Sequence, residues 1–275
     1  MRRIFYFLAT NAAVMVVVSV IMLFLPAELR NQNTSFLIMA LLFGFGGSII
    51  SLLMSKSMAK RSAGVHIIEN PRNETEQWLI STVARPAEQA GIGMPEVGIF
   101  DTPEMNAFAT GANKNNALVA VSTGLLQNMT RDEAEAVMGH EIAHVANGDM
   151  ITLTLIQGVL NTFVIVLARA LAMMIDRDGR GMGYYVGYMA GQAVFGVLAS
   201  VVVSYFSRRR EFRADEGGAD YASAQKMIAA LERLKMGQAG QLPDQLAAFG
   251  INSGMKKLFS THPPLDDRIA ALKNL

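Results

Sequence analysis

The residues in this chain whose types and spacing could do chemistry form the short run His140-Glu141-Ile142-Ala143-His144. Residues four apart on a helix share one face, so both imidazoles can reach a single metal ion. Glu141 follows the first of them, where its carboxylate can hold and deprotonate a water molecule at that metal. The chain has only four histidines, so two of them in this spacing predict a metal-dependent hydrolytic site. The alternative is a pair of surface histidines on an amphipathic helix.

A third protein ligand is needed, because a catalytic zinc ion takes three and leaves one position open for water. The chain contains no cysteine, and the extension that supplies a third histidine is absent, since Asn147 and Met150 stand at its positions. A carboxylate on the same side of the membrane is therefore expected, and Glu211, which directly follows the last of four apolar stretches, is the candidate. Asp215 lies one helical turn further on, where it could accept a hydrogen bond from a ligand imidazole and fix its tautomer. Alternatively, both carboxylates pair with nearby arginines on a solvated helix.

Long stretches almost free of charge divide the chain, and their only charged residue is Arg169. Each has more than the roughly 18 to 20 residues that a helix needs to cross the hydrocarbon core. A fully soluble protein is thereby excluded. Short connections predict two transmembrane hairpins, and the GxxxG pattern of Gly183, Gly187 and Gly191 predicts close helix packing. The expected transmembrane helices span about residues 4–26, 35–55, 151–175 and 181–206.

Basic residues flank these helices mainly on one side, which the positive-inside rule assigns to the cytoplasm. Both termini and the central segment are therefore expected to be cytoplasmic. The net charge of +1 leaves no basic excess for phosphate binding, so no nucleic-acid partner is expected. The basic residues on that side are Arg2, Arg3, Lys56, Lys60, Arg61, Arg208, Arg209 and Arg210.

The segments between the hairpins have the patterns of a folded α+β domain. Asn73 with Glu76 opens a helix, and Thr130 with Glu133 is a capping box that opens the helix carrying the two histidines, with Gly148 as its end. Short β-like runs between these helices indicate a small sheet. The strands are expected at Glu96–Phe100, Asn106–Thr110 and Ala117–Val121, and later helices at Ser223–Lys235, about Pro243–Phe249 and Leu265–Leu272.

The pattern divides the chain into four parts, two in the membrane and two in water. They are an N-terminal transmembrane hairpin (1–55), a catalytic part with the histidine helix (56–150), a second hairpin (151–206) and a helical C-terminal part with the third ligand (207–275).

Taken together, these residues resemble the HtpX family of integral-membrane zinc metalloproteases, relatives of the CAAX prenyl proteases. The resemblance rests on the histidine helix before a membrane hairpin, Glu211-Phe212-Arg213-Ala214-Asp215 after it, and two further motifs. Those motifs are Asn106-Ala107-Phe108-Ala109-Thr110-Gly111 and Thr261-His262-Pro263-Pro264.

This resemblance implies a mainly α membrane protein, with four transmembrane helices and a cytoplasmic gluzincin-like α+β domain. It implies a stress-linked quality-control endopeptidase of the bacterial inner membrane, with one Zn²⁺ per subunit. By motif position, the zinc ligands are His140, His144 and Glu211, and Glu141 is the catalytic carboxylate.

Two further assignments depend on position in the chain. His262 is the candidate donor to the developing oxyanion, and the alternative is a turn-stabilising role beside Pro263. Asn106, Ala107 and Phe108 precede the histidine helix, where an edge strand could bind substrate by backbone hydrogen bonds. The alternative is an internal strand with Phe108 in the core.

The expected partners are the lipid bilayer and unfolded or damaged membrane proteins, and self-cleavage of the chain's own loops is also expected. Two other functions compete with this interpretation. A non-catalytic membrane scaffold or chaperone would close its zinc site with four ligands, whereas this chain offers three and an intact Glu141. A CAAX-type prenyl peptidase would need more than four membrane helices to enclose a lipid-modified tail.

Overall fold

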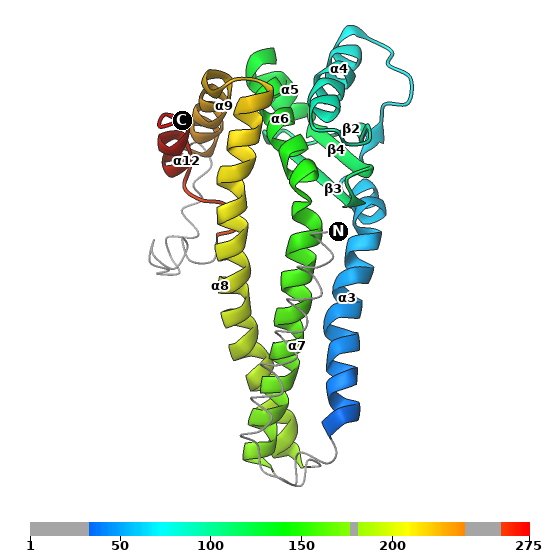
Figure 1. Ribbon diagram of the computed structural model, residues 1–275, viewed down its shortest axis with the longest axis vertical. Coiled ribbons are helices and arrows are strands. Elements are labelled where there is room, and N and C mark those ends of the chain that lie inside the picture. Colours follow the sequence, from blue (N-terminus) through cyan, green and yellow to red (C-terminus); the bar gives the residue numbers. More distant parts are fainter. Residues whose placement is uncertain (1–32, 177–180, 240–259) are drawn as a thin grey trace. The chain divides into compact units, whose positions relative to one another are not determined.

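The computed structural model describes residues 33–176, 181–239 and 260–275, and the chain divides into two compact units (Figure 1). One unit comprises Met1–Ser51 and Leu153–Val203, and the other Leu52–Thr152 and Ser204–Leu275. The helices expected at 4–26 and 243–249 lie outside the described residues.

The first unit contains the apolar parts of three long helices, α3 (Asn33–Ser62), α7 (Asp149–Ile175) and α8 (Met182–Tyr221). Among the described residues these three are long and apolar enough to cross a membrane. The helices α3 and α8 run past the ends expected at 55 and 206, because the charged residues beyond the apolar stretch are also good helix formers.

Close packing of α8 on α7 confirms the interpretation of the glycine pattern. A Cβ added at Gly187 would lie 3.0 Å from the Cα of Ala172, and one at Gly191 would lie 2.7 Å from the Cα of Ala168. Such distances leave no room for a larger side chain, so the small residues allow the two backbones to approach.

The second unit contains a four-stranded mixed sheet in the order β1-β2-β4-β3. Its central pair is parallel, and β3 lies antiparallel to β4 at one edge. The first predicted strand is confirmed with its expected bounds, and the third is one residue longer at each end. The second begins one residue later and ends three residues later than expected, and the two-residue β1 is too short to leave a sequence signal. The strands are β1 (His66–Ile67), β2 (Glu96–Phe100), β3 (Ala107–Asn113) and β4 (Asn116–Ser122).

Helices pack on this sheet around one apolar core. Helix α6 (Arg131–Asn147) is central and contacts α4 (Glu74–Gln89), α9 (Ala224–Ala239) and β3. Met138 and Ile142 of α6 are fully buried in this core. The expected helix at Asn73 is confirmed as α4, which continues through Pro86. Two short helices, α5 (Thr123–Asn128) and α12 (Leu265–Leu272), complete the unit.

Candidate metal centre

Both ends of α6 are fixed by local hydrogen bonds, which sets the direction of its histidines. The backbone N–H of Thr130 donates to Oε2 of Glu133 at 2.7 Å, and the N–H of Glu133 donates to Oγ1 of Thr130 at 3.3 Å. Gly148 ends the helix in the left-handed region, with φ of 67°, and its N–H donates to the carbonyl of His144. Both signals predicted from the sequence are therefore confirmed.

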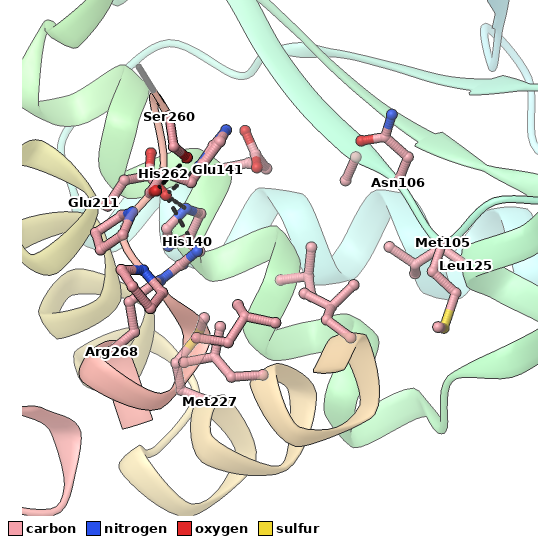
Figure 2. A pocket seen from close by; sticks show the side chains of 17 residues that line it. Met105, Asn106, Leu125, His140, Glu141, Glu211, Met227, Ser260, His262 and Arg268 are labelled. Atoms are coloured by element: carbon pink, nitrogen blue, oxygen red, sulfur yellow. Dashed lines mark hydrogen bonds and ion pairs between the residues drawn. The ribbon is translucent and has the colours of Figure 1, made fainter. Parts of the chain in front are cut away.

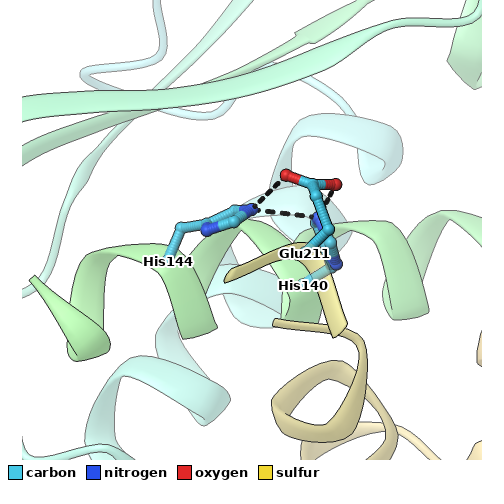
Figure 3. A group of neighbouring side chains, drawn as sticks. All are labelled: His140, His144 and Glu211. Atoms are coloured by element: carbon cyan, nitrogen blue, oxygen red, sulfur yellow. Dashed lines mark hydrogen bonds and ion pairs between the residues drawn. The ribbon is translucent and has the colours of Figure 1, made fainter. Parts of the chain in front are cut away.

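Three ligand atoms from α6 and α8 converge at one point (Figure 3). Nε2 of His140 lies 3.2 Å from Nε2 of His144, and Oε1 of Glu211 lies 3.3 Å from the latter atom. His140 and Glu211 are buried, with 7% and 4% of their surface exposed. The structure thus brings together the two histidines predicted from their spacing and Glu211, the carboxylate expected as the third ligand.

Small residues let α8 approach α6 closely enough to deliver Glu211. A Cβ added at Gly218 would lie 3.1 Å from the backbone nitrogen of His140, and one at Gly217 would lie 2.6 Å from the Cβ of Ala143. A larger residue at either position would push α8 away and carry Glu211 out of reach of the imidazoles.

The other ring nitrogen of each histidine faces a buried carboxylate. Nδ1 of His140 lies 2.9 Å from Oδ1 of Asp215, and Nδ1 of His144 lies 2.6 Å from Oδ2 of Asp149. A neutral imidazole protonated at Nδ1 presents its lone pair at Nε2. Two neutral rings in this tautomer would direct their Nε2 lone pairs, 3.2 Å apart, at one point beside a carboxylate, which a bound cation would stabilise, so this donor set fits a metal ion.

The carboxylates around His144 shift its pKa in the direction opposite to the effect of burial. Burial alone would lower the pKa of this imidazole, but hydrogen bonds to Asp149 and Glu211 raise it to about 10. Without metal the ring is therefore a cation that partly neutralises the charges of Asp149 and Glu211. Metal binding has to displace that proton.

A cavity of about 640 Å³ opens beside the ligands (Figure 2). Glu141, His262, Asn106 and Ala107 line it. The Nδ1 atom of His262 lies 2.8 Å from Oε2 of Glu211, and 65% of the His262 side chain is exposed. The cavity thus joins the ligands to a carboxylate, an imidazole and the start of an edge strand.

Phe108 differs from its two neighbours. Its ring packs 5.4 Å from the ring of Phe100, with an angle of 43° between the planes, and Phe100 is buried. Successive side chains of a strand point to opposite faces. Ala107 and Ala109 pack against the hydrophobic core, so the half-buried side chain of Phe108 lies on the opposite face of β3, against Phe100.

Comparisons with known proteins settle the family. The model of peptidase family M48 matches residues 73–275. The chain belongs to peptidase family M48. It is similar to the protease HtpX of Stenotrophomonas maltophilia (strain K279a), with 59% identity over 99% of this chain and 98% of that protein. A second relative, the protease HtpX of Thioalkalivibrio sulfidiphilus (strain HL-EbGR7), is 57% identical over 99% of each chain.

A solved structure has the same fold. The crystal structure of S. mikatae Ste24p matches with a TM-score of 0.66 and 18% identity, and the match covers 96% of this chain and 64% of that one. With the full-length similarity to HtpX proteases, these findings make this M48 peptidase a membrane metalloendopeptidase.

Arg268 of α12 connects the last helix of this M48 peptidase to the site. Its Nε donates to Oδ2 of Asp215 at 2.7 Å and its Nη2 to Oδ1 at 2.6 Å, while Nη1 lies 3.2 Å from Oε2 of Glu211. Burial alone would lower the pKa of this guanidinium, but the hydrogen bonds to Asp215 raise it above its ordinary value. Arg268 therefore stays charged and balances both carboxylates.

Replacing Arg268 with methionine should destabilise the metal-free protein by about 3–5 kcal/mol, because breaking a buried ion pair leaves its partner uncompensated. The matched control is Lys235→Met. It breaks the exposed pair between Lys235 of α9 and Asp266 of α12, which should cost only about 0–1 kcal/mol. Denaturant unfolding of the two variants in detergent measures the difference. Equal losses would show that Arg268 does not support the site.

Sequence reasoning missed Asp149, Arg210 and Arg268. Asp149 follows the glycine that ends α6, and Nε of Arg210 lies 3.2 Å from its Oδ1. Arg268 is separated from Asp215 by 53 residues. The adjacency of Asp149 to the histidine helix is a signal that could have been used, whereas no local spacing relates Arg268 to the ligands.

Proposed function

We propose that this M48 peptidase is a zinc endopeptidase that hydrolyses unfolded or damaged membrane proteins at the cytoplasmic face of a bacterial inner membrane. The observation that carries the proposal is the convergence of His140, His144 and Glu211 beside a cavity that Glu141 also lines. Two imidazoles and one carboxylate are a usual ligand set of catalytic zinc, which supports one Zn²⁺ per subunit. The basic residues that flank the apolar helices support the cytoplasmic orientation.

Bound there, zinc would supply a Lewis acid that activates water and polarises the peptide carbonyl. Glu141 accepts the proton of the attacking water and passes it to the leaving amine as the peptide bond breaks. This role requires a carboxylate in the cavity that is not itself a ligand, and Glu141 meets both conditions. Asp215 and Asp149 hold the two imidazoles in the tautomer that presents Nε2, which keeps the ligands aligned.

His262 is the proposed donor to the oxyanion that forms on the scissile carbonyl. It lies next to Glu211 at the cavity wall, and its exposed ring can reach a substrate. Substituting alanine should lower kcat about 100- to 1,000-fold, as the loss of one oxyanion donor does. KM should change little, and turnover is compared at full zinc loading, because His262 is not a ligand but contacts the ligand Glu211. Unchanged turnover would assign His262 to the turn that contains Pro263.

Asn106, Ala107 and Phe108 are proposed as the substrate-binding strand. The carbonyl of Asn106 accepts a hydrogen bond from the N–H of Ser122 at 2.9 Å. Because such bonds alternate along an antiparallel pair, the backbone groups of Ala107 and Ala109 point away from β4. A peptide could pair with that open edge by backbone hydrogen bonds, while the side chain of Phe108 packs against Phe100.

Ala109→Pro removes one N–H from the open edge and leaves the pairing with β4 intact. We expect KM for a peptide substrate to rise about fivefold, the equivalent of one hydrogen bond, with kcat and the unfolding temperature nearly unchanged. Ala109→Gly is the control, since it keeps the N–H. A rise in KM that is equal in both variants, or none, would exclude edge pairing.

Two measurements test the proposed function. Proteoliposomes containing the zinc-loaded enzyme should cleave a membrane protein with an unfolded cytoplasmic segment and spare its folded form. The orientation of the chain in the membrane can be measured by labelling a single introduced cysteine, because the natural chain has no cysteine. A cysteine introduced at the exposed Lys114 of the second unit should react with a membrane-impermeant reagent only in inverted vesicles. Labelling in right-side-out vesicles would reverse the orientation.

A further inference from the structure

The first unit, which contains the apolar helices, has a cavity of its own. Its volume is about 560 Å³, and side chains from α3, α7 and α8 line it. The contribution of α3 is Phe36, Met39, Ala40 and Phe43. Because residues three, four and seven apart share one face of a helix, these four form a single stripe along α3. We call this cavity the membrane groove.

Arg169 of α7 is the one charged residue in the lining of the membrane groove. Its guanidinium carbon lies 3.9 Å from the centre of the Phe36 ring, and its Nε is buried without a hydrogen-bond partner among the described residues. The only carboxylate in the described part of this unit is Asp176, about 10 Å further along α7. A buried donor without an acceptor costs free energy, so this end of the groove favours an anion.

Tyr188 of α8 adds a second donor to the lining. Its hydroxyl oxygen accepts a hydrogen bond from Nε2 of Gln192 at 3.1 Å, which leaves the hydroxyl hydrogen to donate. Arg169 is six residues from the end of α7, and Tyr188 is six residues from the beginning of α8, so each lies about 9 Å from its helix end. Because a long cationic side chain can extend to the membrane interface from that depth, both donors can reach a lipid phosphate.

The rest of the membrane groove is apolar. Ile165 lies one turn before Arg169 on α7, and Phe43 lies two turns after Phe36 on α3. The apolar lining therefore continues for about 10 Å from the charged end. Within the described part of the chain, Met39 and Phe43 are 50% and 67% exposed. A cationic end followed by an open apolar groove has the chemical pattern of a phospholipid, in which a phosphate precedes an acyl chain.

We propose that the membrane groove binds one anionic phospholipid, with its phosphate on Arg169 and Tyr188 and one acyl chain along Phe43 and Ile165. Guanidinium and phosphate form a strong, charge-assisted pair. The groove selects an anionic headgroup, since the amine of a zwitterionic headgroup finds no carboxylate in the described lining. Because the lipid contacts α3 and α7 together, it should stabilise their packing.

The test measures quenching of a tryptophan placed in the groove by lipids with brominated acyl chains. The full-length chain carries Phe43→Trp in a Trp78→Phe background, because Trp78 is the only natural tryptophan. It is reconstituted into phosphatidylcholine vesicles that contain increasing amounts of brominated phosphatidylglycerol. We expect quenching that saturates and exceeds the quenching by the same amount of brominated phosphatidylcholine. Inorganic phosphate should not compete, because it has no acyl chain.

Variants with matched controls localise the lipid. Arg169→Gln should weaken phosphatidylglycerol binding about 10- to 100-fold, as the loss of a hydrogen bond to a charged group does. Arg61→Gln removes an exposed cation of α3 outside the groove and should bind as the parent does. Tyr188→Phe should weaken binding about fivefold, and Tyr185→Phe, at a residue that is 62% exposed and outside the lining, should have no effect.

Thermal unfolding gives a second readout that does not depend on the reporter. A ligand that binds only the folded state raises the unfolding temperature. Phosphatidylglycerol should therefore raise the unfolding temperature of the natural chain more than phosphatidylcholine does, and should lose this advantage in Arg169→Gln. The same measurement shows which variants are folded.

The outcomes do not depend on the proposed peptidase function. Quenching that only follows the bulk lipid composition, or equal phosphatidylglycerol binding by the parent and folded Arg169→Gln, overturns the proposal. Competition by inorganic phosphate would assign the site to the free ion instead. Glu28 is the acidic residue that most closely precedes α3 in the sequence. Lipid binding that appears only in Glu28→Gln would make that carboxylate, and not a lipid, the partner of Arg169.

Discussion

Replacing Glu141 with glutamine should lower the rate of peptide cleavage by about 100- to 10,000-fold, the range that a positioned general base contributes. The amide has the same shape as the carboxylate but cannot accept the proton of the attacking water. Glu141 lines the cavity and is not among the three converging ligands. Zinc content and unfolding temperature should therefore stay at wild-type values. Single-turnover cleavage of a labelled peptide, with metal analysis of the same sample, measures both.

The matched control for this variant is Glu232→Gln, an exposed glutamate of α9 in the same unit. It should keep full activity. Activity of Glu141→Gln equal to that of the wild type would mean that another group accepts the proton. If neither protein had activity, the non-catalytic scaffold would be the better account.

Replacing Glu211 with glutamine should weaken zinc binding by more than about 100-fold, beyond the 10- to 100-fold typical for loss of a residue that only supports a ligand. Removing the carboxylate takes away the one anionic ligand. It also takes away the partner of His262, at 2.8 Å, and of Arg268, at 3.2 Å. Competition with a zinc-binding dye gives the affinity directly, independently of any cleavage.

Asp215→Asn and Glu216→Gln complete this comparison. Asp215 contacts His140 through Nδ1, so its asparagine variant should lose about 10- to 100-fold in zinc affinity. Glu216 is exposed on the same helix, and its variant should bind zinc as the wild type does. Stoichiometric zinc in Glu211→Gln at wild-type affinity would mean that the third ligand is another residue.

Much of the metal centre could be predicted because its main signals are local. Thr130 and Gly148 define the helix by hydrogen bonds to near neighbours, and the four-residue spacing of the histidines follows from helix geometry. The third ligand required one long-range argument, namely that the chain returns to the same side of the membrane before Glu211.

The remaining features depend on tertiary packing that no local pattern records. Arg268 was within a predicted helix, but its contact with Asp215 requires α12 to pack against α8, and nothing in residues 260–275 fixes that arrangement. Phe108 was grouped with its neighbours although alternation along a strand separates their side chains. The ends of α3 and α8 were placed where the apolar stretch stops, whereas the backbone hydrogen bonds of a helix continue in water.

Zinc titration of the metal-free enzyme tests the central claim most directly. Detergent-purified protein stripped with a chelator receives increasing zinc, and cleavage of an unfolded substrate is followed together with bound metal. We predict that activity rises in proportion to bound zinc and stops at one equivalent per chain, and that Glu141→Gln binds the same equivalent without activity. Full cleavage by the metal-free protein, or none by folded wild type carrying one zinc, would contradict it.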